Sequence, residues 1–179
     1  MIKILTNKLF LTHFLVLVAF ALVSIVVFNP VLKGDALFQS DIIQYNGMAK
    51  ERNQIRESEA REVYWTDAAF GGMYTYQLGA QYGGHFIKNI DRFIRFLPRP
   101  ADYLFLYLIS FYVLMLVLNV DIRIAILGAL AFGFSTYFMI IIDVGHNAKA
   151  HAIGYFPLLL SGFILLFEKS KWLIGVLLS

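Results

Sequence analysis

The chain has 179 residues, of which 59% are apolar and 15% are charged; it contains no cysteine and carries a net charge of +3. A soluble domain is typically about 45–50% apolar and about 25% charged, so this composition disfavours a soluble globular domain and excludes a disordered or nucleic-acid-coating protein. The lack of cysteine excludes disulfides, cysteine zinc sites and thiol nucleophiles. The small net charge gives no indication of a nucleic-acid partner.

Long apolar runs follow one another along the chain, and a helix needs about 20 apolar residues to cross a bilayer. The first run is too long for a signal peptide and no cleavage site follows it, so we expect an uncleaved anchor. The chain stops inside the last run, which favours a fragment of a longer protein. We therefore expect an all-α, polytopic helical membrane protein with a single transmembrane domain over residues 1–179. The predicted spans are residues 9–32, 104–120, 124–142 and 152–167, with the start of a fifth at 172–179.

The orientation of the spans follows from lysine and arginine in the short connections, which are enriched on the cytoplasmic side. The N-terminus, the 121–123 turn and the 168–171 turn together carry five such residues, whereas the 143–151 connection carries one. The sequence therefore predicts a cytoplasmic N-terminus. Segments 33–103 and 143–151 are predicted to lie on the external side of the membrane.

The external segment 33–103 begins with a predicted helix from Ser40 to about Glu62. Ser40 or Asp41 can cap this helix, with Gln44 as the capping-box partner of Asp41. The charges along the rest of the helix are typical of a solvated face.

Two further pieces complete the external segment. Residues 64–84 combine glycines with aromatic residues such as Trp65, which indicates a loop. These aromatic residues suit sugar stacking and equally suit packing at the membrane interface. From His85 to Leu97 an apolar stripe faces a basic polar side, which is typical of a helix lying in the membrane interface. A soluble core helix is the alternative interpretation.

The 143–151 connection is unusually rich in ionisable residues for a link between two apolar runs. Ionisable groups at membrane depth are candidates for function. If the connection begins a helix, His146 and Lys149 share one face and could grip a phosphate. Asp143 could bind a divalent metal ion. A polar interface loop without chemistry is the alternative. The polar residues are Asp143, His146, Asn147, Lys149 and His151.

Three sequence blocks in this order resemble the N-terminal part of the YfhO-like bacterial integral membrane proteins, which are themselves similar to GT-C glycosyltransferases. The blocks are Gln39–Gln44, Trp65–Gln77 and Gly145–Lys149. The resemblance spans nearly the whole chain, whereas members of the family are much longer. One departure is Tyr74 after Met73, where the family often has proline.

The resemblance implies a GT-C-like multi-pass enzyme of the bacterial inner membrane with juxtamembrane helices in its external loop. It would transfer a sugar from a polyprenyl-phosphate donor to a cell-envelope glycan or lipid acceptor at the outer face. Asp41 would be the catalytic base or the group that orients the acceptor, and Asp143 would assist acceptor or metal binding. The substrate-binding residues would be Gln44, Trp65, His146, Asn147 and Lys149, with Arg92 or Arg95 at the interface.

Two alternatives remain open. One is a non-enzymatic membrane protein of the same fold that binds or transports lipid-linked glycans, and the other is a membrane scaffold with an interfacial helix. The enzyme hypothesis expects Asp41 within about 15 Å of the 143–149 loop, because both must reach one substrate. A transporter would instead place its site near the bilayer midplane, where this sequence has few polar residues.

Overall fold

The computed structural model describes residues 2–35, 37–79, 86–167 and 175–176. Helices account for 75% of this part, which confirms the all-α expectation. The chain divides into two compact units. Unit 1 comprises residues 1–37 and 93–179, and unit 2 comprises residues 38–92.

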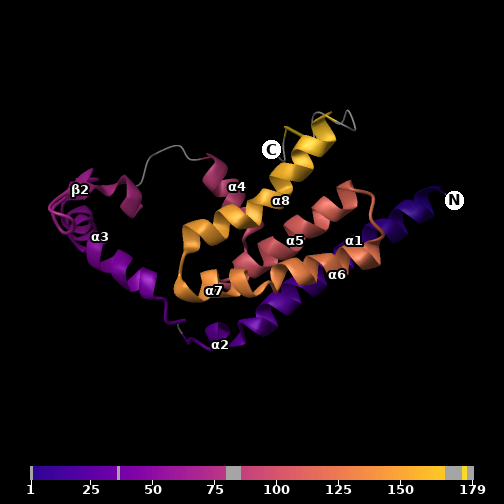
Figure 1. Ribbon diagram of the computed structural model, residues 1–179, viewed down its shortest axis with the longest axis horizontal. Helices are drawn as coiled ribbons and strands as arrows, with labels where there is room; N and C mark the ends of the chain where they lie inside the picture. Colours follow the sequence, from indigo (N-terminus) through magenta and orange to yellow (C-terminus); the bar gives the residue numbers. More distant parts are fainter. Residues whose placement is uncertain (1, 36, 80–85, 168–174, 177–179) are drawn as a thin grey trace. The chain divides into compact units, whose positions relative to one another are not determined.

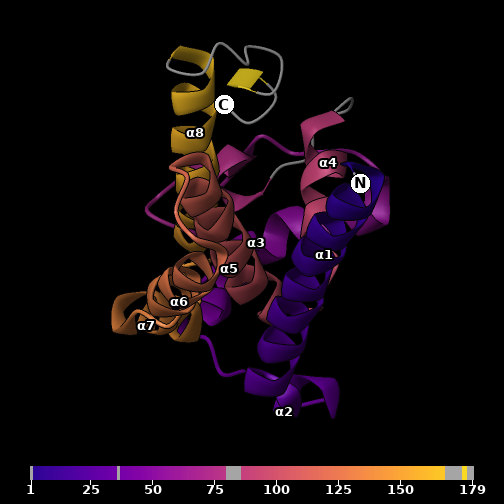
Figure 2. The ribbon, with the colours of Figure 1, turned by 90° about the vertical axis from the view of Figure 1, so that its right-hand side faces the viewer.

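Unit 1 is a helical bundle built around α5. The bundle contains α1 (Ile2–Val27), α2 (Asn29–Leu32), α5 (Ala101–Val117), α6 (Ile122–Gly133), α7 (Thr136–Val144) and α8 (Asn147–Phe167). α5 packs against α1, α6 and α8, and Figure 2 shows α1 on one side of it and α6 and α8 on the other. The sequence of α5 is apolar on every side, which suits a helix enclosed by its neighbours.

The helices of unit 1 include membrane-spanning candidates. Among the described residues, Lys8–Val27 of α1 and the whole of α8 are long and apolar enough to cross a bilayer. α6 and α7 add a third if they are counted as one bent span, whereas α5 is apolar but has only 17 residues. These lengths support a membrane protein. The four-span topology and the GT-C-like fold stay predictions.

The predicted continuous span over 124–142 is divided into two helices that meet at a bend of 45°. α6 ends at Gly133, and the non-helical Ser135, with a ψ of 129°, precedes α7. Gly133 packs directly on α5, since a Cβ at this position would lie 2.7 Å from Leu108 Cδ2. Glycine and serine together are a common cause of helix kinks. The contact with α5 explains why a residue without a side chain stands at this position.

Four polar side chains of the bundle make hydrogen bonds close by. Three buried serines bond back to a carbonyl of their own helix, as Ser24 Oγ does to Phe20 O at 2.9 Å. His13 of α1 shares a hydrogen bond of 2.7 Å with the Tyr112 hydroxyl of α5. These bonds remove the cost of burying the polar atoms in an apolar bundle. The other two serines are Ser110 and Ser161.

Unit 2 joins one long helix to a short hairpin. Its elements are α3 (Ser40–Glu59), β1 (Trp65–Thr66), β2 (Met73–Tyr74), the 3-10 helix η1 (Thr75–Leu78) and the larger part of α4 (Phe86–Ile94). The strands are antiparallel, with Trp65 opposite Tyr74. The sequence predicts a loop over this segment, whereas the structure shows the two paired strands β1 and β2. Side chains of α3 hold the hairpin in place.

The contacts between α3 and the hairpin are hydrogen bonds to side chains. The Glu51 carboxylate accepts from the Thr66 hydroxyl and from the Asp67 N–H. The Tyr45 hydroxyl donates to the Leu78 carbonyl at 2.9 Å. The hairpin is therefore tied to α3 at β1 and again at the end of η1.

The ends of the predicted helices differ from expectation in detail. α3 ends at Glu59, because Ala60 adopts a left-handed conformation with a φ of +53°. The expected capping box is wrong: Gln39 occupies the N-cap position, and its side chain makes no capping bond to the first turn of α3. α4 lies within the predicted helix that ends at Leu97; His85 and most of the fifth apolar run lie outside the described residues.

Candidate functional site

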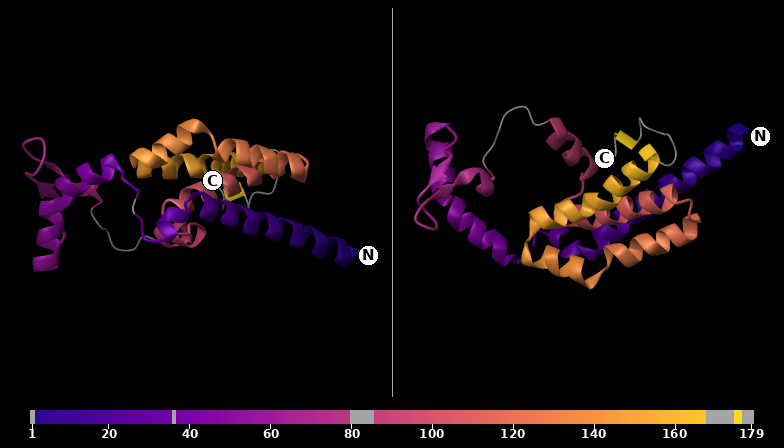
Figure 3. Two further views of the ribbon diagram at one scale, coloured as in Figure 1. Left: turned by 90° about the horizontal axis from the view of Figure 1, so that it is seen from below. Right: turned by 45° about the horizontal axis from the view of Figure 1, so that its top comes forward.

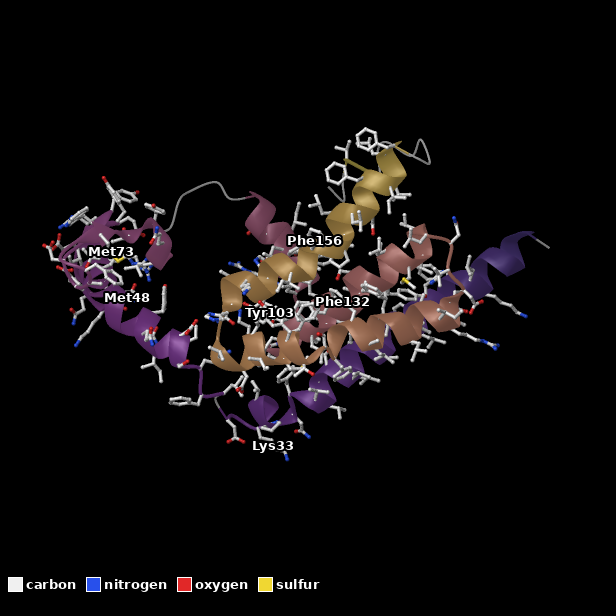
Figure 4. All side chains as sticks on the ribbon, viewed as in Figure 1. Lys33, Met48, Met73, Tyr103, Phe132 and Phe156 are labelled. Atoms are coloured by element: carbon white, nitrogen blue, oxygen red, sulfur yellow. The ribbon has the colours of Figure 1, made fainter. Side chains whose placement is uncertain are left out.

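Two groups of polar residues of unit 1 lie where α5 begins and where α7 turns into α8. We call residues 95–103 and 143–149 the polar end of unit 1. A shared apolar cluster joins the two segments, because Tyr103 of α5 packs with Ile142 of α7 and Ala150 of α8. The end of α1, the start of α5 and the α7–α8 turn lie together in Figures 1 and 3. Tyr103 and Phe132 lie between the helices of the bundle in Figure 4.

The α7–α8 turn is tight because Gly145 adopts a φ of +94°. The Gly145 and His146 N–H groups both donate to the Ile141 carbonyl, at 3.3 and 3.1 Å. This arrangement satisfies the last turn of α7 and redirects the chain at once into α8. The helix that the sequence analysis expects here is present, and the His146 carbonyl accepts its first backbone bond from Ala150.

The predicted site residues of this turn lie within unit 1 and close together in the chain. Asp143, His146 and Lys149 are exposed, whereas Asn147 is partly buried. The Lys149 ammonium lies 5.2 Å from the centre of the Tyr137 ring. A cation over an aromatic face is held in place while it keeps access to an anion.

A second group of charges lies at the start of α5. Asp102 is only 2% exposed and its carboxylate pairs with Arg95, which is 9% exposed. Arg99 stands 3.9 Å from the same carboxylate but is 62% exposed. Both guanidiniums lie over the Tyr103 ring, at 5.4 and 5.7 Å from its centre. This cluster carries one more positive than negative charge.

Asp102 precedes the predicted span 104–120, and its environment acts on its ionisation. Burial raises the pKa of the Asp102 carboxyl above its ordinary value, and the charges of Arg95 and Arg99 oppose that rise. Arg92 or Arg95 is expected from the sequence as a contact at the interface, but the Arg95 guanidinium pairs with Asp102. Arg99 is the more accessible arginine.

Sequence reasoning missed Arg99, Asp102 and Tyr103. A signal was present, because an arginine and an aspartate stand directly before a long apolar run, where a charge is costly unless it has a partner. The pairing of Asp102 with Arg95, seven residues away, depends on the bend at Pro98 and Pro100.

An apolar cavity of about 330 Å³ lies in unit 1. Among the described residues that line it, Asp143 is the one charged residue, and the others are apolar. Such a cavity accepts hydrocarbon and offers a single polar group at one point. The lining residues are Phe28, Leu37, Met139, Ile140, Ile142 and Asp143.

The remaining predicted site residues belong to unit 2. Asp41 is partly buried in the first turn of α3, where the helix dipole favours a negative charge. Gln44 is exposed one turn later, and Trp65 of β1 is 49% exposed. The expected approach of Asp41 to the 143–149 turn stays a prediction.

The metal prediction rests on Asp143. Within residues 2–35, 37–79, 86–167 and 175–176, no three acidic or histidine side chains gather as a metal site. A divalent ion at Asp143 stays a prediction. Comparison with protein-family models, curated proteins and solved structures finds no match to this chain.

Proposed function

We propose that the chain acts as a GT-C-type membrane glycosyltransferase, which moves a sugar from a polyprenyl-phosphate donor to a cell-envelope glycan or lipid acceptor. In this proposal the polar end of unit 1 receives the donor phosphate at the outer face of the bacterial cytoplasmic membrane. The observation that carries the proposal is the presence of accessible cations in the same helical bundle as an apolar cavity.

A polyprenyl phosphate combines an anionic head with a long hydrocarbon tail, so its site needs cations next to apolar surface. The polar end offers the exposed guanidinium of Arg99 and the exposed ammonium of Lys149. Asp102 and Tyr103 hold the arginine, and Tyr137 holds the lysine. Cations that are positioned before the ligand arrives lose less side-chain entropy on binding.

The proposed reaction needs a base for the acceptor and cations for the leaving phosphate. The Asp41 carboxylate would take the proton of an acceptor hydroxyl, whose oxygen then bonds to the anomeric carbon of the sugar. The bond from that carbon to the phosphate oxygen breaks, and the phosphate leaves with the electron pair. Arg99, Lys149 and His146 would stabilise its charge. Gln44, Trp65 and Asn147 are proposed to orient the sugars.

The role of Asp41 is tested with the purified protein in nanodiscs, a radiolabelled polyprenyl-phosphate sugar and a membrane-extracted acceptor. Asp41→Asn should lower transfer at least about 100-fold, because general base catalysis typically contributes that much. Asp35→Asn is the matched control, since Asp35 is exposed and lies outside the helices. Equal transfer by the two variants would remove Asp41 from the mechanism.

The phosphate site is tested separately by binding of a fluorescent polyprenyl phosphate without sugar. Arg99→Ala and Lys149→Ala should each weaken binding about tenfold, since a charge-assisted hydrogen bond contributes about 1.5–3 kcal/mol. Arg123→Ala is the control, because Arg123 is exposed at the start of α6. Equal affinity of all three variants would refute the phosphate site.

The same pair of experiments separates the enzyme from the non-enzymatic alternative. An enzyme shows transfer that depends on Asp41 and binding that depends on Arg99. A protein that only binds or transports lipid-linked glycans shows the binding alone. Wild-type protein that binds the lipid but transfers no sugar to any acceptor would overturn the proposed enzymatic activity.

A further inference from the structure

The hairpin of unit 2 presents a row of exposed aromatic rings. Trp65, Tyr74 and Tyr76 are 49%, 62% and 56% exposed. Trp65 and Tyr74 are direct partners across the two strands, so their side chains lie on the same face of the hairpin. The ring centres are 5.3 Å apart for Trp65 and Tyr74, and 5.9 Å apart for Tyr74 and Tyr76. We call these three residues the aromatic platform.

The aromatic platform is held in place by its surroundings. The Trp65 indole N–H donates to Asp67 Oδ1 at 3.0 Å. The indole also lies directly on Gly72, where a Cβ would stand 2.4 Å from Trp65 Cζ2. Behind the rings, Thr66 and Thr75 are almost completely buried and make side-chain hydrogen bonds. Such support keeps large rings exposed in one orientation, which lowers the entropy lost on binding.

Polar groups lie at the edge of the aromatic platform. Asp67 is exposed beside the indole, and the Gln77 amide donates to the Tyr76 hydroxyl at 3.3 Å. A pyranose ring has an apolar C–H face and a rim of hydroxyl groups. An aromatic face with hydrogen-bonding groups at its edge matches both.

From this arrangement we propose that the aromatic platform binds a neutral glycan by stacking of its sugar rings. The proposal deepens the proposed function. It rests on that function in one respect only, which is that the bound glycan is the acceptor. A membrane interface is the competing partner of exposed tryptophan and tyrosine. Interfacial segments combine such aromatic residues with lysine and arginine, which attract anionic lipids. Within residues 63–79 the sole charged residue is Asp67, which is acidic. The charge therefore favours a neutral sugar over a lipid surface.

The test uses the whole chain in nanodiscs, since the headgroup of a maltoside detergent is itself a sugar. Cellohexaose and maltohexaose are titrated by calorimetry. Trp65→Ala, Tyr74→Ala and Tyr76→Ala should each weaken binding about tenfold. Phe70→Ala is the control, because Phe70 is 87% exposed and lies outside the aromatic platform. Unchanged circular dichroism of each variant separates lost binding from lost structure.

A second measurement distinguishes the membrane as the partner. The chain has two tryptophans, so Trp172→Phe leaves Trp65 as the only tryptophan, whose emission is followed with selective excitation. Proteoliposomes with brominated phospholipid should leave Trp65 emission unquenched, and cellohexaose should shift it to shorter wavelength. Quenching by the lipid would overturn the proposal, as would titrations in which neither sugar binds or in which all four alanine variants bind equally.

Failure of this proposal is distinguishable from failure of the proposed function. Asp41→Asn should lose transfer but keep oligosaccharide binding, because Asp41 is no part of the aromatic platform. Trp65→Ala should keep the affinity for the fluorescent polyprenyl phosphate. If the aromatic platform binds sugar but the protein transfers none, this inference is supported and the proposed enzymatic activity is refuted.

Discussion

Arg95 and Asp102 form an ion pair that is almost completely buried at the start of α5, with exposed fractions of 9% and 2%. Arg99 approaches the same carboxylate from solvent and keeps 62% of its side chain exposed. The two arginines therefore have different roles. Arg95 compensates a buried charge, whereas Arg99 remains accessible to an anion.

Removal of the two arginines should affect stability very differently. Arg95→Ala leaves a buried carboxylate without its main partner and should cost about 3 kcal/mol of unfolding free energy. Arg99→Ala removes an exposed charge and should cost less than about 1 kcal/mol. Unfolding in one fixed detergent, followed by circular dichroism, measures both. Equal losses would show that the Arg95–Asp102 pair does not stabilise the start of α5.

Two glycine-to-alanine substitutions should change the free energy of unfolding in opposite directions. A Cβ at Gly154 of α8 would lie 2.5 Å from Leu106 Cδ2 and 2.8 Å from Leu106 Cγ. Gly154→Ala should therefore destabilise the α5–α8 contact by about 1–3 kcal/mol. Gly47 lies inside α3 with open space around its Cβ position, so Gly47→Ala should stabilise by about 0.5–1 kcal/mol. A thermal unfolding midpoint that is unchanged or raised in Gly154→Ala would contradict the close packing of α8 on α5, and a lowered midpoint in Gly47→Ala would contradict the open space around Gly47.

The link between α3 and the hairpin should depend on Glu51. Glu51→Ala removes the acceptor of the Thr66 hydroxyl and the Asp67 N–H, which should cost about 1–2 kcal/mol. We expect proteases to cut Glu51→Ala between residues 60 and 79 faster than they cut the wild type, as measured by mass spectrometry. Glu57→Ala is the control, because Glu57 is exposed on the same helix. If both variants are cut at the wild-type rate, another contact holds the hairpin.

Two neighbouring glycines should affect the aromatic platform unequally. Gly72 has a φ of +121° and contacts the Trp65 indole, whereas Gly71 has a φ of +70° and open space around its Cβ position. Either change to alanine strains the backbone. Only Gly72→Ala should displace the indole, and it should weaken cellohexaose binding about tenfold relative to Gly71→Ala. Equal binding by the two variants would show that Gly72 does not position Trp65.

Much of the secondary structure follows from local pattern. α3 begins at Ser40 as expected, and α8 occupies the fourth apolar run after starting a few residues earlier. Helix periodicity and capping tendencies are local properties, so a single sequence contains them. The capping box failed because Gln39, not Ser40 or Asp41, takes the N-cap position. The hairpin was missed because its strands have only two residues each, too few for a recognisable alternation.

The candidate site likewise has one part that follows from local sequence and another part that depends on the folded chain. The density of ionisable residues beside an apolar run predicts a site at the 143–149 turn, and the structure places that turn at one end of unit 1. The contribution of Asp102 and Arg99 was not foreseen, because their value depends on burial against Tyr103 and on a partner across a proline-containing bend. Burial of a charge is decided by neighbours, which a linear pattern does not contain.

By itself, the sequence determined that this protein is mostly α-helical and contains helices long and apolar enough to cross a membrane, because length and hydropathy accumulate along consecutive residues. Only the tertiary structure decided where the third apolar run breaks, which arginine remains accessible and which rings face outward on the hairpin. Each of these depends on contacts between residues that are distant in the chain, such as Gly133 with Leu108, Tyr103 with Ala150 and Glu51 with Thr66. Packing and hydrogen bonding between such residues arise only when the chain is folded.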